Sequence, residues 1–92
     1  MRATGEIQVI PIGTGVSVRQ QVQLAHGMLA DSGLHVELHG QGTNVEGELS
    51  DILSAVERIH EALHAEGVVR LATFVKIGTR LDKEPSLAAK LF

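Results

Sequence analysis

Hydrophobic and polar positions alternate along residues 6–12, a segment rich in β-branched side chains that ends at two closely spaced glycines. This pattern predicts a strand. Ile7 and Val9 point to one face of it, and Ile10 and Ile12 point to the other. Because both faces carry apolar groups, we expect a central strand of a sheet.

A first helix is predicted to begin at Ser17, because Ser17 and Gln20 have the spacing of a capping box. Apolar residues then recur at three- and four-residue spacing and form one stripe, namely Val18, Val22, Ala25 and Leu29. Gly33 is expected to end this helix in a left-handed conformation.

Residues 34–39 alternate strictly between apolar and polar side chains, and residues 43–48 follow a glycine-containing turn at 40–42. The two segments together predict a β-hairpin. In the first of them, the alternation directs Leu34, Val36 and Leu38 toward the core and His35, Glu37 and His39 toward the other face.

A second helix is predicted to begin at Ser50 and Asp51, because a hydroxyl can cap the first turn and a carboxylate favours the positive end of the helix dipole. Its apolar stripe is Ile52, Val56, Ile59 and Leu63, and Gly67 is expected to end it. Residues 68–77 form the most hydrophobic predicted strand. Leu71, Thr73, Val75 and Ile77 share one face of this strand, and Arg70, Ala72, Phe74 and Lys76 share the other.

The predicted order is strand, helix, strand, strand, helix, strand. That order indicates an α+β fold of the ferredoxin-like βαββαβ type, with a four-stranded antiparallel sheet and both helices on one face. We expect one domain spanning residues 1–92, with a short helical tail at about 86–92. Because this fold hosts many functions, the function has to be sought in particular residues.

Composition excludes several classes of protein. The chain has 92 residues, 43% hydrophobic and 21% charged, which suits one small folded domain. No apolar run approaches the roughly 18 residues of a membrane span. With no cysteine there is no disulfide framework, which is compatible with a cytoplasmic protein. A net charge of −3 and only two aromatic residues argue against nucleic-acid binding.

Three short motifs have both a chemical and a purely structural interpretation. His60-Glu61-Ala62-Leu63-His64 matches the helical zinc motif HExxH, but no third ligand follows, so a zinc hydrolase is the weakest hypothesis. Residues 13–15 resemble part of a dinucleotide fingerprint without its third glycine. Two interpretations of this segment remain open: it binds an anion or a polar ligand atom at the start of the helix, or it is a plain turn. His35, Glu37 and His39 are either half a metal site or the solvated face of a strand.

The sheet face away from the helices is the most informative feature. It is expected to combine apolar and charged side chains, namely Gln8, Ile10, Ile12, His35, Glu37, His39, Glu46, Arg70, Phe74 and Lys76. A solvated face does not need Ile10 and Phe74, and a core does not tolerate unpaired charges. Such a face suits a subunit interface that encloses a small polar ligand, or one held by ion pairs without a ligand.

Three segments taken together, VIPIGTGVS at 9–17, GTNVEG at 42–47 and KIGTRLDK at 76–83, resemble the thiamine-binding (YkoF-like) family of small ferredoxin-like proteins. The resemblance implies a non-catalytic protein that binds thiamine or its hydroxymethylpyrimidine part. It implies no catalytic residue, resident cofactor or metal, and a homodimer or homotetramer that assembles through the open sheet face. Nucleic acid and membrane are not expected partners.

The resemblance also implies ligand-binding residues. Gly13, Thr14 and Ser17 would act as loop groups, and Thr43 and Glu46 as polar contacts. Two further candidates come from the chemistry of thiamine: Glu37 for its cationic ring, and Phe74 for stacking on its pyrimidine. The alternative hypothesis is a regulatory or scaffolding module that assembles without a ligand or around a different one.

Overall fold

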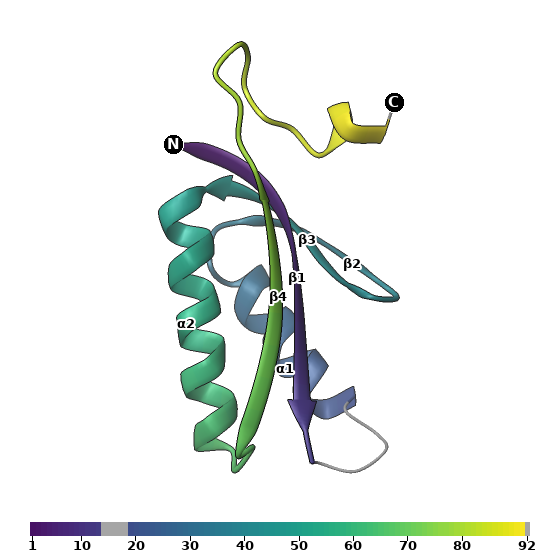
Figure 1. The fold of residues 1–92 in the computed structure, drawn as a ribbon, viewed down its shortest axis with the longest axis vertical. Helices are drawn as coiled ribbons and strands as arrows, with labels where there is room; N and C mark the ends of the chain where they lie inside the picture. Colours follow the sequence, from purple (N-terminus) through teal and green to yellow (C-terminus); the bar gives the residue numbers. More distant parts are fainter. Residues whose placement is uncertain (14–18, 92) are drawn as a thin grey trace.

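The computed structural model describes residues 1–13 and 19–91. Its elements, in chain order, are β1 (Arg2–Ile12), α1 (Arg19–Ala30), β2 (His35–His39), β3 (Gly42–Glu48), α2 (Leu49–Ala65), β4 (Arg70–Gly78) and the short 3-10 helix η1 (Ala88–Leu91). The strands form one antiparallel sheet in the order β2-β3-β1-β4, and both helices lie on one side of it (Figure 1). The predicted ferredoxin-like fold is confirmed.

Strand β1 lies in the middle of the sheet and is paired on both sides. Its residues from Arg2 to Ile7 pair with β3, and those from Thr4 to Ile12 pair with β4. It begins four residues before the predicted start at Glu6, because pairing with β3, and from Thr4 onward also with β4, holds a stretch whose own side chains show little strand preference. Gly5 is required there, since a Cβ on it would lie 2.3 Å from the carbonyl oxygen of Lys76.

The predicted division of side chains between the two faces is confirmed by the strand register. Core residues of the sheet point toward the helices, among them Ala3, Ile7 and Val45. They pack against Ala25 and Leu29 of α1 and against Ile52, Ala55, Ile59 and Leu63 of α2. Val22, predicted in the stripe of α1, is 38% exposed, and Val18 lies outside the described residues.

The helix ends differ in part from the prediction. Gly67 and Gly33 have the expected left-handed conformation, with φ of 98° and 84°. The predicted start of the second helix at Ser50 is wrong: α2 begins at Leu49, and Glu48 is its N-cap without a side-chain cap. The backbone N–H of Leu49 donates to the carbonyl of Met1 at 2.8 Å, so the residue before β1 satisfies one of the donors that the first turn of a helix leaves unpaired. The Ser17 capping box lies outside the described residues.

None of the helices in the described ranges, 1–13 and 19–91, is long and apolar enough to cross a membrane.

Two glycine substitutions are expected to have opposite effects on stability. Gly5→Ala should lower the free energy of unfolding by about 1–3 kcal/mol, because its methyl group collides with the β4 backbone. Gly27→Ala, in α1 with no atom within 4 Å of the added Cβ, should raise it by up to about 1 kcal/mol. Urea denaturation monitored by circular dichroism measures both; a Gly5→Ala protein as stable as the parent would contradict the packing described.

Candidate functional site

One row of polar side chains crosses all four strands on the face away from the helices, here called the open face. Glu37 of β2 lies opposite Asn44 of β3, Asn44 lies opposite Glu6 of β1, and Glu6 lies opposite Lys76 of β4. Directly opposed residues of antiparallel strands share a face. Two carboxylates, an amide and an ammonium group therefore lie side by side at the middle of the sheet.

A hollow of about 480 Å³ lies over this row, here called the open-face hollow. Its floor includes Thr4 and Gly5 of β1, and its apolar wall is formed by Leu87 and Ala88 near the C-terminus. A hollow of this volume is within the range of about 300–1,000 Å³ that small-molecule sites occupy.

Each carboxylate of the row already contacts an imidazole. The Nε2 atom of His35 lies 3.2 Å from Oε2 of Glu37, and Nε2 of His39 lies 3.0 Å from Oε2 of Glu6. His39 reaches β1 across Gly42, which has no side chain to obstruct it. No group of three or more histidine, aspartate or glutamate side chains with the geometry to hold a metal ion occurs within the described part of the chain.

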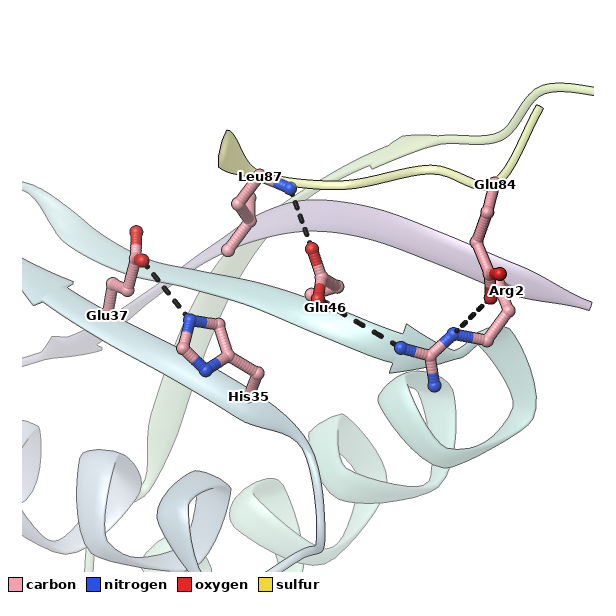
Figure 2. A network of polar contacts seen from close by, with 6 residues as sticks. All are labelled: Arg2, His35, Glu37, Glu46, Glu84 and Leu87. Carbon is pink, nitrogen blue, oxygen red and sulfur yellow. Dashed lines mark hydrogen bonds and ion pairs between the residues drawn. The ribbon is translucent and has the colours of Figure 1, made fainter. Parts of the chain in front are cut away.

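The segment after β4, residues 79–91, returns over the end of the open face and is here called the C-terminal strap. The backbone N–H of Leu87 donates to Oε1 of Glu46 at 2.7 Å (Figure 2). Arg2 lies between the two acids, with Nε 3.4 Å from Glu84 and Nη2 4.0 Å from Glu46. Thr4 beneath the strap is only 1% exposed. The hydrogen bond to Glu46 of β3 and the ion pair with Arg2 of β1 therefore hold the strap against the sheet.

A turn at the start of the strap is fixed by a bidentate pair. The guanidinium of Arg80 donates two hydrogen bonds to the carboxylate of Asp82. These bonds lower the pKa of Asp82 to about 2. The carboxylate therefore stays ionised throughout the physiological pH range.

The structure brings together only some of the predicted ligand residues. Glu37 lines the open-face hollow, and Phe74 lies on the same face, two positions from Lys76 and thus about 7 Å away along β4. Glu46 is on this face too, but its carboxylate is engaged by the strap. Phe74 is 65% exposed.

The other predicted ligand residues lie elsewhere. Thr43 points to the helix-covered face, where it is 5% exposed and lines a second hollow. Gly13 follows the far end of β1. It is nine residues, or about 30 Å of extended strand, from Thr4, which lines the open-face hollow and pairs with Glu46. Thr14 and Ser17 lie outside the described residues.

Sequence reasoning named Glu37 as a ligand candidate but missed the other three members of the polar row: Glu6, Asn44 and Lys76. The sequence did contain part of the information that assigns these residues to the open face. Small or apolar residues alternate with polar ones along β3, and this alternation separates Thr43 from Asn44 and Glu46. The contact of Glu46 with the strap joins residues 41 positions apart and has no local signature.

The two histidines of the HExxH motif have partners on neighbouring elements. Nε2 of His60 lies 2.6 Å from the hydroxyl of Thr73 on β4, and Nδ1 of His64 lies 2.7 Å from the carbonyl oxygen of Val68. Their rings meet edge to face, with centroids 6.2 Å apart. His60 therefore connects α2 to β4, and His64 connects α2 to the segment between α2 and β4.

Fold and site together define a small ferredoxin-like protein with a ligand-sized hollow on its uncovered sheet face. Residues 5–92 match the family model described as "Thiamine-binding protein", and the chain belongs to this family.

Similar proteins cover nearly the whole chain. A UPF0045 protein of Synechocystis sp. is 37% identical over 91 residues, which are 99% of this chain and 75% of that protein. The UPF0045 protein YqgV of Bacillus subtilis is 33% identical, over 97% of this chain and 90% of its own. The crystal structure of the hypothetical protein MJ1052 of Methanocaldococcus jannaschii has a TM-score of 0.91 at 34% identity, covering 98% of this chain and 92% of that one.

The strap contacts make a prediction about Glu46. Glu46→Ala should release the strap, because Leu87 and Arg2 both lose their acceptor, at a cost of about 1–2 kcal/mol. Trypsin should then cleave after Lys83 several times faster than in the parent protein. Glu61→Ala, on the exposed side of α2, is the matched control and should leave the rate unchanged. Equal cleavage rates in all three proteins would show that Glu46 does not hold the strap.

Proposed function

We propose that this protein binds thiamine, or the pyrimidine part of thiamine, in the open-face hollow, and that it binds without catalysing a reaction. Membership of the thiamine-binding protein family supports the class of ligand. The observation that carries the choice of site is the pair of carboxylates, Glu6 and Glu37, in the lining of this hollow. Thiamine contains a cationic thiazolium ring, and acidic side chains attract it.

The chemistry of the hollow also suits the uncharged half of the ligand. An aminopyrimidine presents an amine donor and ring-nitrogen acceptors. Carboxylate oxygens and the Asn44 amide accept from the amine, while Lys76 and the Asn44 amide donate to ring nitrogens. Leu87 and Ala88 of the strap offer apolar contact to the edge of the rings.

The monomer leaves this site half open. Glu37 and Glu6 have side chains that are 53% and 43% exposed, so solvent screens their attraction for a cation. A cover that excluded water would strengthen the same attraction. The proposal therefore includes a second copy of the chain over the open face.

Exposed apolar side chains on the open face support this assembly. Phe74 is 65% exposed and Ile12 is 38% exposed, and Ile10 lies on the same face. Both helices lie on the opposite side, so neither covers these side chains, and a second molecule would cover them. An antiparallel twofold pairing would bring the Gly13 end of the partner toward the strap end, where the predicted loop groups and the hollow would meet.

The same apolar side chains favour a second candidate function, an assembly module that holds no small molecule. Native mass spectrometry of protein purified without denaturation separates the two functions. A ligand-binding oligomer should carry additional mass of a thiamine-related compound on part of the population. An assembly module should give the bare oligomer and no heat on titration with thiamine.

Removal of one charge should weaken thiamine binding. Glu37→Gln keeps the shape of the side chain but not its charge, and should raise the Kd for thiamine about two- to tenfold in isothermal titration. Glu61→Gln makes the same change in net charge on the exposed side of α2 and should leave the Kd unaltered. The site assignment fails if both variants behave alike, and the function fails if the parent protein gives no heat at millimolar thiamine.

A charge at the apolar end of the open face should split the oligomer. Phe74→Asp places an unpaired carboxylate where the proposed interface is apolar, so sedimentation should show a smaller species than the parent protein. Because Phe74 is 65% exposed, helical circular dichroism should be retained. A parent protein that sediments as a monomer at micromolar concentration would contradict the proposed assembly.

A further inference from the structure

Two imidazoles of α2 lie one helical turn apart. His60 and His64 are separated by four residues within the helix, so their side chains share one face of it. His64 is exposed and His60 is partly exposed, and their ring centroids are 6.2 Å apart. Both rings can therefore be reached from solvent, and they lie near enough to each other to be considered as ligands of one metal ion.

The partner of His64 determines which of its two ring nitrogens is free. Nδ1 lies 2.7 Å from the carbonyl oxygen of Val68. Because a carbonyl oxygen only accepts, Nδ1 carries the proton and donates, and the lone pair of the neutral ring is on Nε2. Metal-binding histidines commonly donate their other ring N–H to a backbone carbonyl in this way, which fixes the orientation of the ring and makes the free nitrogen more basic.

His60 is oriented in a similar way by β4. Its Nε2 lies 2.6 Å from the hydroxyl of Thr73. A hydroxyl accepts as well as donates, so Nε2–H can donate to it and leave the lone pair on Nδ1. One nitrogen of each imidazole is therefore engaged by a neighbouring segment of the chain, and the other is left for a ligand.

A small movement separates the two rings from the geometry of a shared metal ion. With metal–nitrogen bonds of about 2.0–2.1 Å, two imidazoles on one tetrahedral ion have centroids roughly 5 Å apart. The observed separation of 6.2 Å exceeds this value by about 1 Å. A modest rotation of the exposed His64 side chain closes a difference of this size.

Two carboxylates on the same face of α2 add negative charge. Glu57 and Glu61 are exposed, and together with the two histidines they follow the i, i+3, i+4, i+7 spacing of one helix face. Their charges attract a cation toward the imidazoles. Since no three histidine, aspartate or glutamate side chains in the described part of the chain have the geometry to hold a metal ion, water would complete the coordination. Two protein ligands distinguish this arrangement from the three of a catalytic zinc site.

We propose that His60 and His64 form a two-histidine binding site for a divalent late transition-metal cation, namely Cu²⁺, Ni²⁺ or Zn²⁺. Imidazole is a suitable ligand for all three ions, and affinity at a given site increases from Ni²⁺ to Cu²⁺. Because the helix brings the two rings together only in the folded protein, bound metal stabilises the fold. Helix α2 lies on the other side of the sheet from the open-face hollow, so the proposal is independent of thiamine binding there (Figure 1).

NMR with Cu²⁺ as the probe tests the location on the parent protein. Paramagnetic Cu²⁺, added below one equivalent, should first broaden the backbone amide signals of residues 57–68. The competing candidates are β2, which carries His35 and His39, and the N-terminal amine. Broadening that begins at either of these and spares α2 would overturn the proposal, and so would an absence of broadening at one equivalent.

Three variants test the ligands by isothermal titration with Ni²⁺. Thr73→Val removes the partner that orients His60 and should raise the Kd for Ni²⁺ about tenfold. His64→Gln keeps a donor for the Val68 carbonyl but removes the ligand nitrogen, so its effect should be at least as large. His35→Gln makes the same replacement on the exposed face of β2 and should leave the Kd unchanged.

A His64→Gln protein that binds Ni²⁺ as tightly as the parent, or a loss of affinity confined to His35→Gln, would overturn the proposal. Because the amide broadening is measured on the parent protein, a variant that does not fold leaves the test intact.

Discussion

The side-chain alternation of β1 determines the arrangement of the whole molecule. This strand is paired on both sides, so its register determines which side chains of β3 and β4 lie on the same face as each side chain of β1. The pairing of β3 with β2 does the same for β2. Two helices cover only one of the two faces. Ile7 and Thr43 consequently lie in the interior, while their chain neighbours Glu6 and Asn44 lie on the uncovered side. The two hollows are a direct result, one acidic and partly open, the other apolar and uncharged.

The C-terminal strap contacts Glu46, a residue that the family resemblance implies as a ligand contact. The carboxylate of Glu46 accepts from the Leu87 backbone and attracts Arg2, so it helps to hold the strap. In return the strap supplies Leu87 and Ala88 as a wall of the open-face hollow. Glu46 is linked to this hollow through the position of the strap, whereas Glu37 and Glu6, each in contact with a histidine, line the hollow themselves.

The sequence predicted the fold well because strand and helix periodicities encode which face is buried. The alternation of residues 68–77 correctly predicted that Phe74 lies on the other face of β4 from Leu71 and Val75. The left-handed glycines predicted after the two helices, Gly33 and Gly67, were also correct. The predicted start of α2 was one residue late: the helix begins at Leu49, whose N–H donates to the carbonyl of Met1, a residue distant in the sequence. The candidate ligand residues were harder to predict: the alternation along β3 already separates Thr43 from Glu46, but the pairing of Glu6 with Asn44 and Lys76 and the return of the strap to Glu46 are long-range features without a local pattern.

The central claim is that the cation of thiamine goes to the acidic, uncovered face of the sheet. A crystal structure of the protein grown with thiamine tests it most directly. The account predicts the thiazolium ring within about 4–6 Å of the Glu37 or Glu6 carboxylate, the distance at which opposite charges interact strongly, with the strap over its edge. Thiamine density in the apolar hollow between α1 and the sheet, with the acidic row left free, would contradict it.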